Sequence, residues 1–258
     1  MFSQAPRQIY RYNPLAEVIC QLRFPEILTI GANLPVDFQE AVRDEFPQFS
    51  SRQELLTPRI AGNLHLQKQQ TITNYQFTSA DGVWSLNLTS RFISITCRQY
   101  RCWEDFAKKL DNPLAAFIKI YRPAYFERIG LRYLNFISRK TLQLEDIPYS
   151  QLIEPCWLGP LSQEDVHPGS VSRCGVDAEL ALRSGCRVKI HAGPGMVKRG
   201  GQPDPEPKFV LDLDLFQPEK TAVNLSADTM QKLHSQAFLI FRGAITDTLH
   251  EAMEPNTD

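Results

Sequence analysis

Asp212 and Asp214 are the residues of this sequence whose spacing is best suited to metal chemistry. They alternate with apolar residues over 209–216, so in a strand both carboxylates lie on one face. Two carboxylates on one face can share a divalent cation, which makes a metal-dependent phosphodiesterase one candidate function. The same alternation is typical of any strand with one polar side, and no third acidic residue has a compelling spacing. We therefore predict a structural role for the pair, and no cofactor.

Basic and aromatic residues are interleaved over 91–140, a segment that contains 11 basic and 4 acidic residues. Basic groups beside aromatic rings can follow a phosphate backbone and stack on bases. The alternative is that the aromatic rings belong to the core and the charges to a solvated outer face. The candidate nucleic-acid-binding residues, including basic positions farther along the chain, are Lys108, Lys109, Lys119, Arg122, Arg187, Lys189, Lys198 and Arg199.

Arg128 and Arg132 form a separate candidate site. They share one face of a predicted strand with Gly130 and Leu134, a face that is neither clearly solvent nor clearly core. A half-buried pair of arginines is suited to the recognition of a carboxylate or phosphate. The pair is therefore predicted to recognise an anion and not to carry out catalysis.

Motifs of the common enzyme classes do not occur in the sequence. There is no G-x-S-x-G, no phosphate-binding loop, and no pair of histidines at the spacing of a zinc site. The sequence therefore favours a non-enzymatic binding or assembly protein that acts through protein partners or as a homo-oligomer. A nucleic-acid-binding accessory protein is the first alternative, and the phosphodiesterase is the second.

The elements expected in the first half begin with a buried strand and continue into an antiparallel meander. Asp81-Gly82 predicts a hairpin turn, and Asn112-Pro113 predicts a break between two helices. The expected strands are 17–24, three in the meander between 63 and 98 (around 71–77, 84–88 and 92–98), and 126–137. The expected helices are 35–46, 100–110 and 114–121.

The second half is expected to contain three strands and then one long helix. The strands are 176–183, 186–191 and 209–216, and the helix runs from Ser226 to about Met253. Residues 192–208 are rich in glycine and proline and predict an exposed, mobile loop. The fold class is α+β with largely antiparallel sheets, divided into residues 1–140 and 141–258 that pack as one unit.

Several segments resemble, in order, a sporadically distributed family of uncharacterised bacterial proteins of about this length. They are 13–18, Phe24-Pro25, 38–46, 128–135, 211–214 and 233–249. The resemblance spans nearly the whole chain. It implies a bacterial, cytoplasmic protein, and it brings no assigned activity, cofactor or catalytic residue.

Composition is that of an ordinary globular protein of 258 residues, with 43% apolar and 22% charged residues and a net charge of −1. The longest apolar run is far shorter than the ~20 residues of a membrane helix, so no membrane association is predicted. The N-terminal segment lacks the apolar centre of a signal peptide, which predicts a cytoplasmic location. Six scattered cysteines are expected to be buried, reduced thiols.

Overall fold

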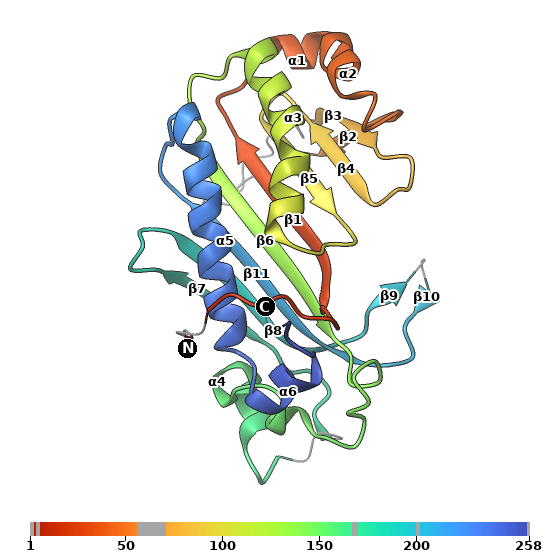
Figure 1. The fold of residues 1–258 in the computed structure, drawn as a ribbon, viewed down its shortest axis with the longest axis vertical. Coiled ribbons are helices and arrows are strands. Elements are labelled where there is room, and N and C mark those ends of the chain that lie inside the picture. Colours follow the sequence, from red (N-terminus) through yellow and green to blue (C-terminus); the bar gives the residue numbers. More distant parts are fainter. Residues whose placement is uncertain (1–2, 4–5, 56–70, 167–169, 200–201, 257–258) are drawn as a thin grey trace, which may run out of the picture.

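A large antiparallel sheet forms the centre of the molecule in the computed structural model (Figure 1), which describes residues 3, 6–55, 71–166, 170–199 and 202–256. Nine strands of this described part are hydrogen-bonded in the order β2-β3-β4-β5-β1-β6-β11-β8-β7. Their bounds are β1 Leu15–Arg23, β2 Gln48–Leu55, β3 Thr71–Thr78, β4 Trp84–Leu88, β5 Phe92–Cys97, β6 Arg128–Ile137, β7 Val176–Ala181, β8 Arg187–Gly195 and β11 Lys208–Gln217. The predicted α+β class with a largely antiparallel sheet is confirmed.

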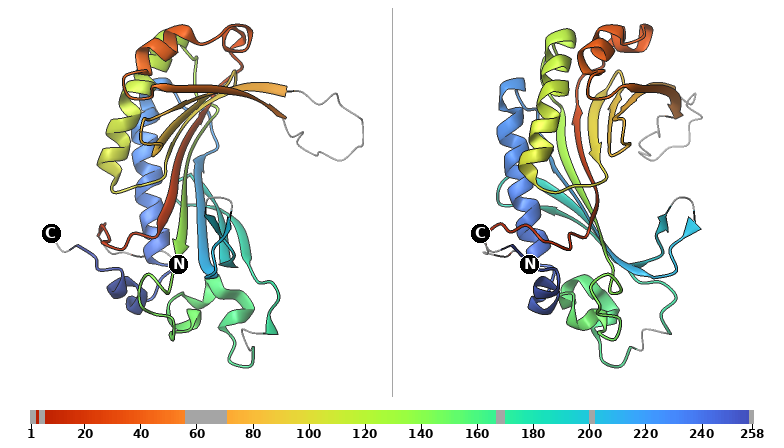
Figure 2. Two further views of the ribbon diagram at one scale, coloured as in Figure 1. Left: turned by 90° about the vertical axis from the view of Figure 1, so that its right-hand side faces the viewer. Right: turned by 45° about the vertical axis from the view of Figure 1, so that its right-hand side comes forward.

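Two helices, α3 (Trp103–Tyr121) and α5 (Ser226–Arg242), lie side by side on one face of the sheet (Figures 1 and 2). Strand residues that face these helices are apolar and fully buried, as at Leu22, Leu131 and Leu213. Removing this apolar surface from water is the main stabilising contribution to the fold. The shorter helices are α1 Leu28–Ala32, α2 Val36–Val42, α4 Pro155–Leu158 and α6 Asp247–Ala252.

The central strands join the two parts of the chain. β6 lies between β1 and β11, with Tyr133 opposite both Val18 and Leu213. Residues 1–140 and 141–258 therefore contribute strands to the same sheet. Within the described ranges, no helix is long and apolar enough to cross a membrane.

The predicted long C-terminal helix is shorter than expected. α5 ends at Arg242, and α6 begins at Asp247, after four intervening residues. Gly243 has a low helix propensity, and the Thr246 side chain accepts a hydrogen bond from the Leu249 N–H, which caps a new helix start. The prediction of one helix from Ser226 to Met253 was therefore wrong, although its first 17 residues are helical as expected.

The predicted break at Pro113 is also wrong, because α3 is one helix of 19 residues with Pro113 inside it. A proline within a helix removes one backbone hydrogen bond and is normally costly. Pro113 is buried together with Leu110, Leu114 and Phe117, so the packing of this face against the core offsets the lost bond.

Strand β2 was not predicted. Its residues are exposed at nearly every position, so the strand lacks the alternation of apolar and polar residues that marks a half-buried strand. The beginning of the meander expected from residue 63 lies outside the described residues. The turn expected at Asp81-Gly82 is present, with Gly82 at a φ of 72°.

The segment predicted as a loop over 192–208 contains more regular structure than expected. β8 continues to Gly195, and β9 (Lys198–Arg199) pairs with β10 (Gln202–Pro203) in a separate two-stranded sheet. Figure 2 shows this hairpin projecting from the side of the main sheet that is opposite the two long helices.

All six cysteines are free thiols, but their burial varies. Cys20, Cys97 and Cys186 are buried, whereas Cys156 is exposed. The expectation of buried thiols is therefore confirmed for only part of the set.

Candidate functional site

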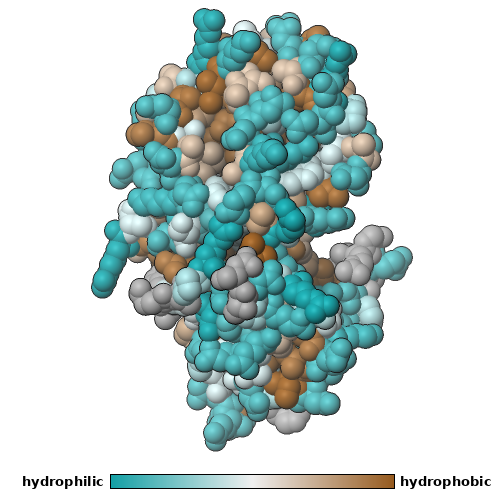
Figure 3. All heavy atoms as spheres, in the orientation of Figure 1, coloured by the Kyte–Doolittle hydropathy of each residue, from teal (hydrophilic) through white to brown (hydrophobic). Residues whose placement is uncertain are grey.

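The face of the sheet opposite α3 and α5 is not covered by a described helix, and it is concave (Figure 2). We call it the open face. The helix side, which faces the viewer in Figure 3, is mainly hydrophilic with scattered hydrophobic groups. A hollow with a volume of about 650 Å³ lies on the open face over β1, β6, β11 and β8. Its lining includes Ile19, Gln21, Arg23, Glu127, Arg128, Arg132, Glu179, Lys189, Asp214 and Phe216.

Arg128 and Arg132 are hydrogen-bonded to the two aspartates of the neighbouring strand β11. Arg128 Nη2 donates to both carboxylate oxygens of Asp214, at 2.8 and 2.9 Å. Arg132 donates to Asp212 through Nε and Nη2, at 2.8 and 2.5 Å. The hydrogen bond with Asp212 raises the pKa of Arg132 above its usual value. The predicted anion-binding arginines and the predicted acidic pair are thus partners of each other.

Local structure explains how Arg128 reaches its position. Its guanidinium lies over the Phe216 ring, 4.5 Å from the centroid. A Cβ at Gly130 would lie 2.4 Å from the Arg128 Nη1 atom, so only a glycine leaves room for this conformation. Arg128 is therefore held in this conformation by the Phe216 ring, the Asp214 carboxylate and the space that Gly130 leaves free.

The same pattern continues across the next two strands. Arg187 of β8 contacts Glu179 of β7 at 2.9 Å, and Lys189 lies 3.9 Å from the same carboxylate. His191 Nδ1 lies 2.8 Å from Asp177. Basic strands β6 and β8 therefore alternate with acidic strands β11 and β7, and the positive and negative charges of the open face are interleaved.

This pairing of charges is relevant to the two alternative functions, a metal-dependent phosphodiesterase and a nucleic-acid-binding protein. Asp212 and Asp214 face arginines, and within the described residues no group of three or more His, Cys, Asp or Glu side chains could hold a metal ion. Arg187 and Lys189 face carboxylates on the open face, where exposed ion pairs of this kind contribute about 0–1 kcal/mol each to stability.

The other predicted nucleic-acid residues lie elsewhere. Lys108, Lys109 and Lys119 belong to α3 and Arg122 follows it, on the far side of the sheet from Arg187 and Lys189. Lys109 contacts Glu45 at 2.7 Å. Lys198 and Arg199 form β9, and the positions of their side chains lie outside what the structure describes. The eight residues are therefore not gathered on one surface.

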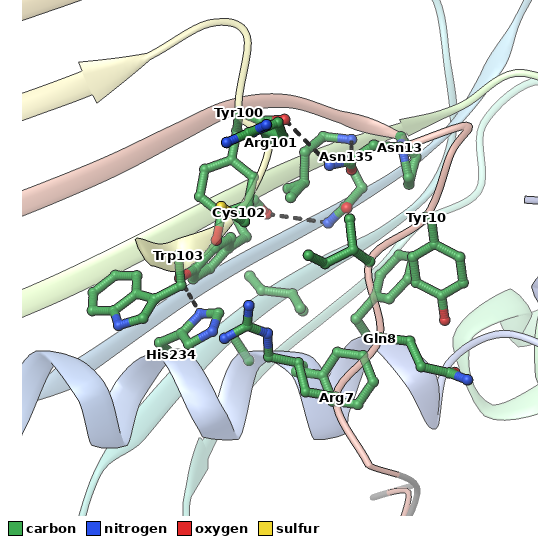
Figure 4. A pocket seen from close by; sticks show the side chains of 18 residues that line it. Arg7, Gln8, Tyr10, Asn13, Tyr100, Arg101, Cys102, Trp103, Asn135 and His234 are labelled. Atoms are coloured by element: carbon green, nitrogen blue, oxygen red, sulfur yellow. Dashed lines mark hydrogen bonds between the residues drawn. The ribbon is translucent and has the colours of Figure 1, made fainter. Parts of the chain in front are cut away.

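A pocket that the sequence did not predict lies on the helix side (Figure 4). Residues 7–10 and 13–15 form one wall, and the others come from α5, β6, β11 and residues 100–103 at the start of α3. His234 of α5 is buried, its Nδ1 lies 2.9 Å from the Tyr133 hydroxyl, and its ring stacks on Trp103 with 4.6 Å between centroids. Burial, and secondarily the nearby Arg7, lowers the pKa of His234 to about 4.

The sequence contained one signal for this pocket. Met230, Leu233, Ala237 and Phe241 follow helical spacing, and His234 falls within that apolar stripe, so it was expected as a surface or hydrogen-bonded interfacial group. The structure places it in the interface. Its partners Trp103 and Tyr133 are each more than 100 positions away in the sequence, so no local pattern connects them.

No protein-family model matches this chain, and no curated protein is detectably similar to it in sequence. The likeness to a family of bacterial proteins stays a prediction. Function is therefore argued from the arrangement of the residues themselves.

Proposed function

We propose that this chain is a non-enzymatic binding protein, and that the open face is where it docks a protein partner. The observation that carries this proposal is the balanced charge of the hollow. Four basic residues, Arg23, Arg128, Arg132 and Lys189, line the hollow together with three acidic ones, Glu127, Glu179 and Asp214. Asp212, the partner of Arg132, lies beside it.

Balanced charge favours a protein over a nucleic acid. A phosphate backbone is bound by an excess of basic groups that releases counterions, and the basic residues of this hollow are matched by carboxylates. A protein surface offers both signs of charge together with apolar groups. Ile19 and Phe216 supply apolar surface within the same hollow.

The existing ion pairs also lower the cost of binding. Arg128 and Arg132 are each held by two hydrogen bonds, so less side-chain entropy is lost when a partner covers them. Their remaining N–H groups can still donate to a partner, because a guanidinium has five.

Self-association is a second candidate, favoured by strand β2. It is at one edge of the sheet, and seven of its eight residues are exposed. An edge strand offers unpaired backbone groups to another strand. A second copy of the chain could extend the sheet there.

A cytoplasmic location is part of the proposal. It is supported by six free thiols, one of them exposed, which fit a reducing compartment. The resemblance to bacterial proteins points to the same location.

The test is affinity purification of the tagged protein from the cells that express it, with and without nuclease. The open-face variant combines Arg23→Glu with Lys189→Glu, and the matched control combines Lys108→Glu with Lys119→Glu on α3. All four side chains are exposed, and both variants change the net charge equally.

We expect the wild type and the α3 control to retain the same protein after nuclease treatment, and the open-face variant to lose it. A partner that disappears with nuclease, or that the α3 variant loses instead, would refute the proposal. Retention by all three proteins would also refute it.

A further inference from the structure

The end of the molecule that carries β2 combines an open sheet edge with exposed apolar side chains. β2 is an edge strand of the nine-stranded sheet, and no described strand pairs with its outer side. Figure 1 shows α1, α2 and β2 at this same end. Of the eight large hydrophobic side chains that are exposed among the described residues, five lie here, namely Leu28, Leu34, Val36, Phe49 and Leu55. An open edge beside exposed apolar groups indicates an interaction surface.

β2 lacks the features that usually protect an edge strand from pairing. All eight of its residues pair with β3 in one register without a bulge, and the strand contains no proline, glycine or lysine. Its charges, Arg52 and Glu54, cancel. The other edge strand, β7, carries Asp177 and Glu179 and no basic residue, so like charges disfavour its pairing with a copy of itself. β2 is therefore the edge that is open to another strand.

The two sides of β2 differ in character, because alternate residues of a strand point to opposite faces. On the helix side, the Phe49 ring lies 5.3 Å from the buried ring of Phe77, yet 47% of Phe49 is exposed. Leu55 is on the same side and is 62% exposed. On the open-face side, Arg52 Nε donates to Glu54 at 2.7 Å.

This pattern is self-complementary when two β2 strands pair in the antiparallel direction about a two-fold axis perpendicular to the sheet. With Arg52 on the axis, residues 49–55 of both strands are paired, and Phe49 lies opposite Leu55 of the second copy in both halves of the interface. Each Arg52 then has Glu54 of the second copy on its diagonal. The other register that pairs seven residues would place Phe49 opposite a glutamine.

We propose that two copies of this chain join through β2 in this antiparallel pairing, which makes one sheet that runs through both chains. The inference deepens the self-association suggested above and rests on it. The two strands left at the outer edges are both β7, so the assembly is closed at two copies. Because the axis is perpendicular to the sheet, both open faces lie on the same side of the dimer.

The first test is sedimentation velocity of the full chain over a series of concentrations. The β2 variant combines Phe49→Lys with Leu55→Lys, and the matched control combines Met196→Lys with Leu225→Lys, whose side chains are 60% and 50% exposed elsewhere. Both variants add the same charge. We expect the wild type and the control to dimerise as concentration rises, and the β2 variant to have a dimer Kd at least about tenfold higher, because lysine on an edge strand opposes pairing.

The second test is backbone hydrogen exchange of the wild type, followed by mass spectrometry at low and high concentration. In an edge strand, alternate N–H groups point away from the neighbouring strand and are unpaired. We expect exchange in β2 to slow as concentration rises, and exchange in β7 to stay the same. This measurement needs no variant, so it decides the matter even if Phe49→Lys disturbs folding.

The outcomes separate the pairing from self-association itself. A monomer at every concentration would overturn both. A dimer that persists in the β2 variant, or that protects β7 and not β2, would overturn the pairing and leave self-association through another surface. Polymers that grow with concentration would also overturn it, because they require β2 to pair with β7 of the next copy. Partner docking on the open face is tested separately, with Arg23 and Lys189.

Discussion

Charged side chains on the open face meet their partners across neighbouring strands and not along one strand. Arg128 reaches Asp214, and Arg132 reaches Asp212, with both pairs held by two hydrogen bonds. These pairs are partly exposed, so their contribution to stability is small. Their effect is to give the face a fixed pattern of charge that a partner can recognise.

Among the described histidines, His234 has the pKa that the fold alters most strongly. Its pKa in the folded protein is about 4, because burial disfavours the charged imidazole, against about 6.5 in an unfolded chain. Between these values the unfolded state binds a proton that the folded state does not. The free energy of unfolding therefore falls as pH decreases from about 6.5 to about 4 and levels off below.

We predict that His234 removes about 1 kcal/mol of stability between about pH 7 and about pH 5.5. Urea unfolding of the wild type and of His234→Gln at both pH values measures this contribution as a difference. Glu104, whose pKa is lowered to about 2 by its hydrogen bond with Arg7, stays ionised throughout that range and does not contribute. Identical pH dependence in the two proteins would contradict the prediction.

At the scale of elements, the sequence predicts those that bury one regular face. β11 alternates apolar and polar residues and was expected within a residue of each end, and the stripe on α5 was also recognised. β2 could not be predicted, because neither of its faces is buried. The helix through Pro113 could not be predicted either, because it depends on core packing that a local rule does not contain.

The candidate site was predictable only in part for the same reason. Arg128, Arg132, Asp212 and Asp214 were each identified, but their pairing depends on the adjacency of β6 and β11. The pocket residues come from segments that meet only in the fold, such as Arg7, Trp103 and His234. Residues so far apart in the sequence form no local pattern from which their contact could be predicted.

The β9–β10 hairpin gives a prediction at this scale. Its two strands share only two residue pairs, and its base is fixed by Lys208–Asp204 at 2.7 Å and by Ser138–Glu206 at 2.6 Å. A short pair that projects from the sheet opens locally at low cost. Among basic residues in the described strands, we expect trypsin to cut first after Lys198 or Arg199, as peptide mass spectrometry of a time course would show.

The control combines Lys198→Gln with Arg199→Gln, which should remove this early fragment pair and leave later cuts unchanged. Cleavage after Lys189, within the fully paired strand β8, before any cut in the hairpin would contradict the expectation. It would mean that the hairpin is docked, as in an interface.

At the scale of the whole molecule, the two faces of the sheet differ in what they offer. One face is covered by α3 and α5 and encloses the aromatic pocket, whereas the other is concave and carries interleaved charges (Figure 2). The two sites are therefore separated by the sheet itself.

The central claim, that a protein partner covers the open face, is tested most directly by lysine acylation in the recovered complex. Lys189 lies on the open face with 58% of its side chain exposed, and Lys119 is exposed on α3. Mass spectrometry compares the acylation rate of each lysine in the free protein and in the complex. The account predicts that Lys189 reacts much more slowly in the complex and that Lys119 reacts at the same rate in both. Protection of Lys119 with an unchanged Lys189 would contradict it.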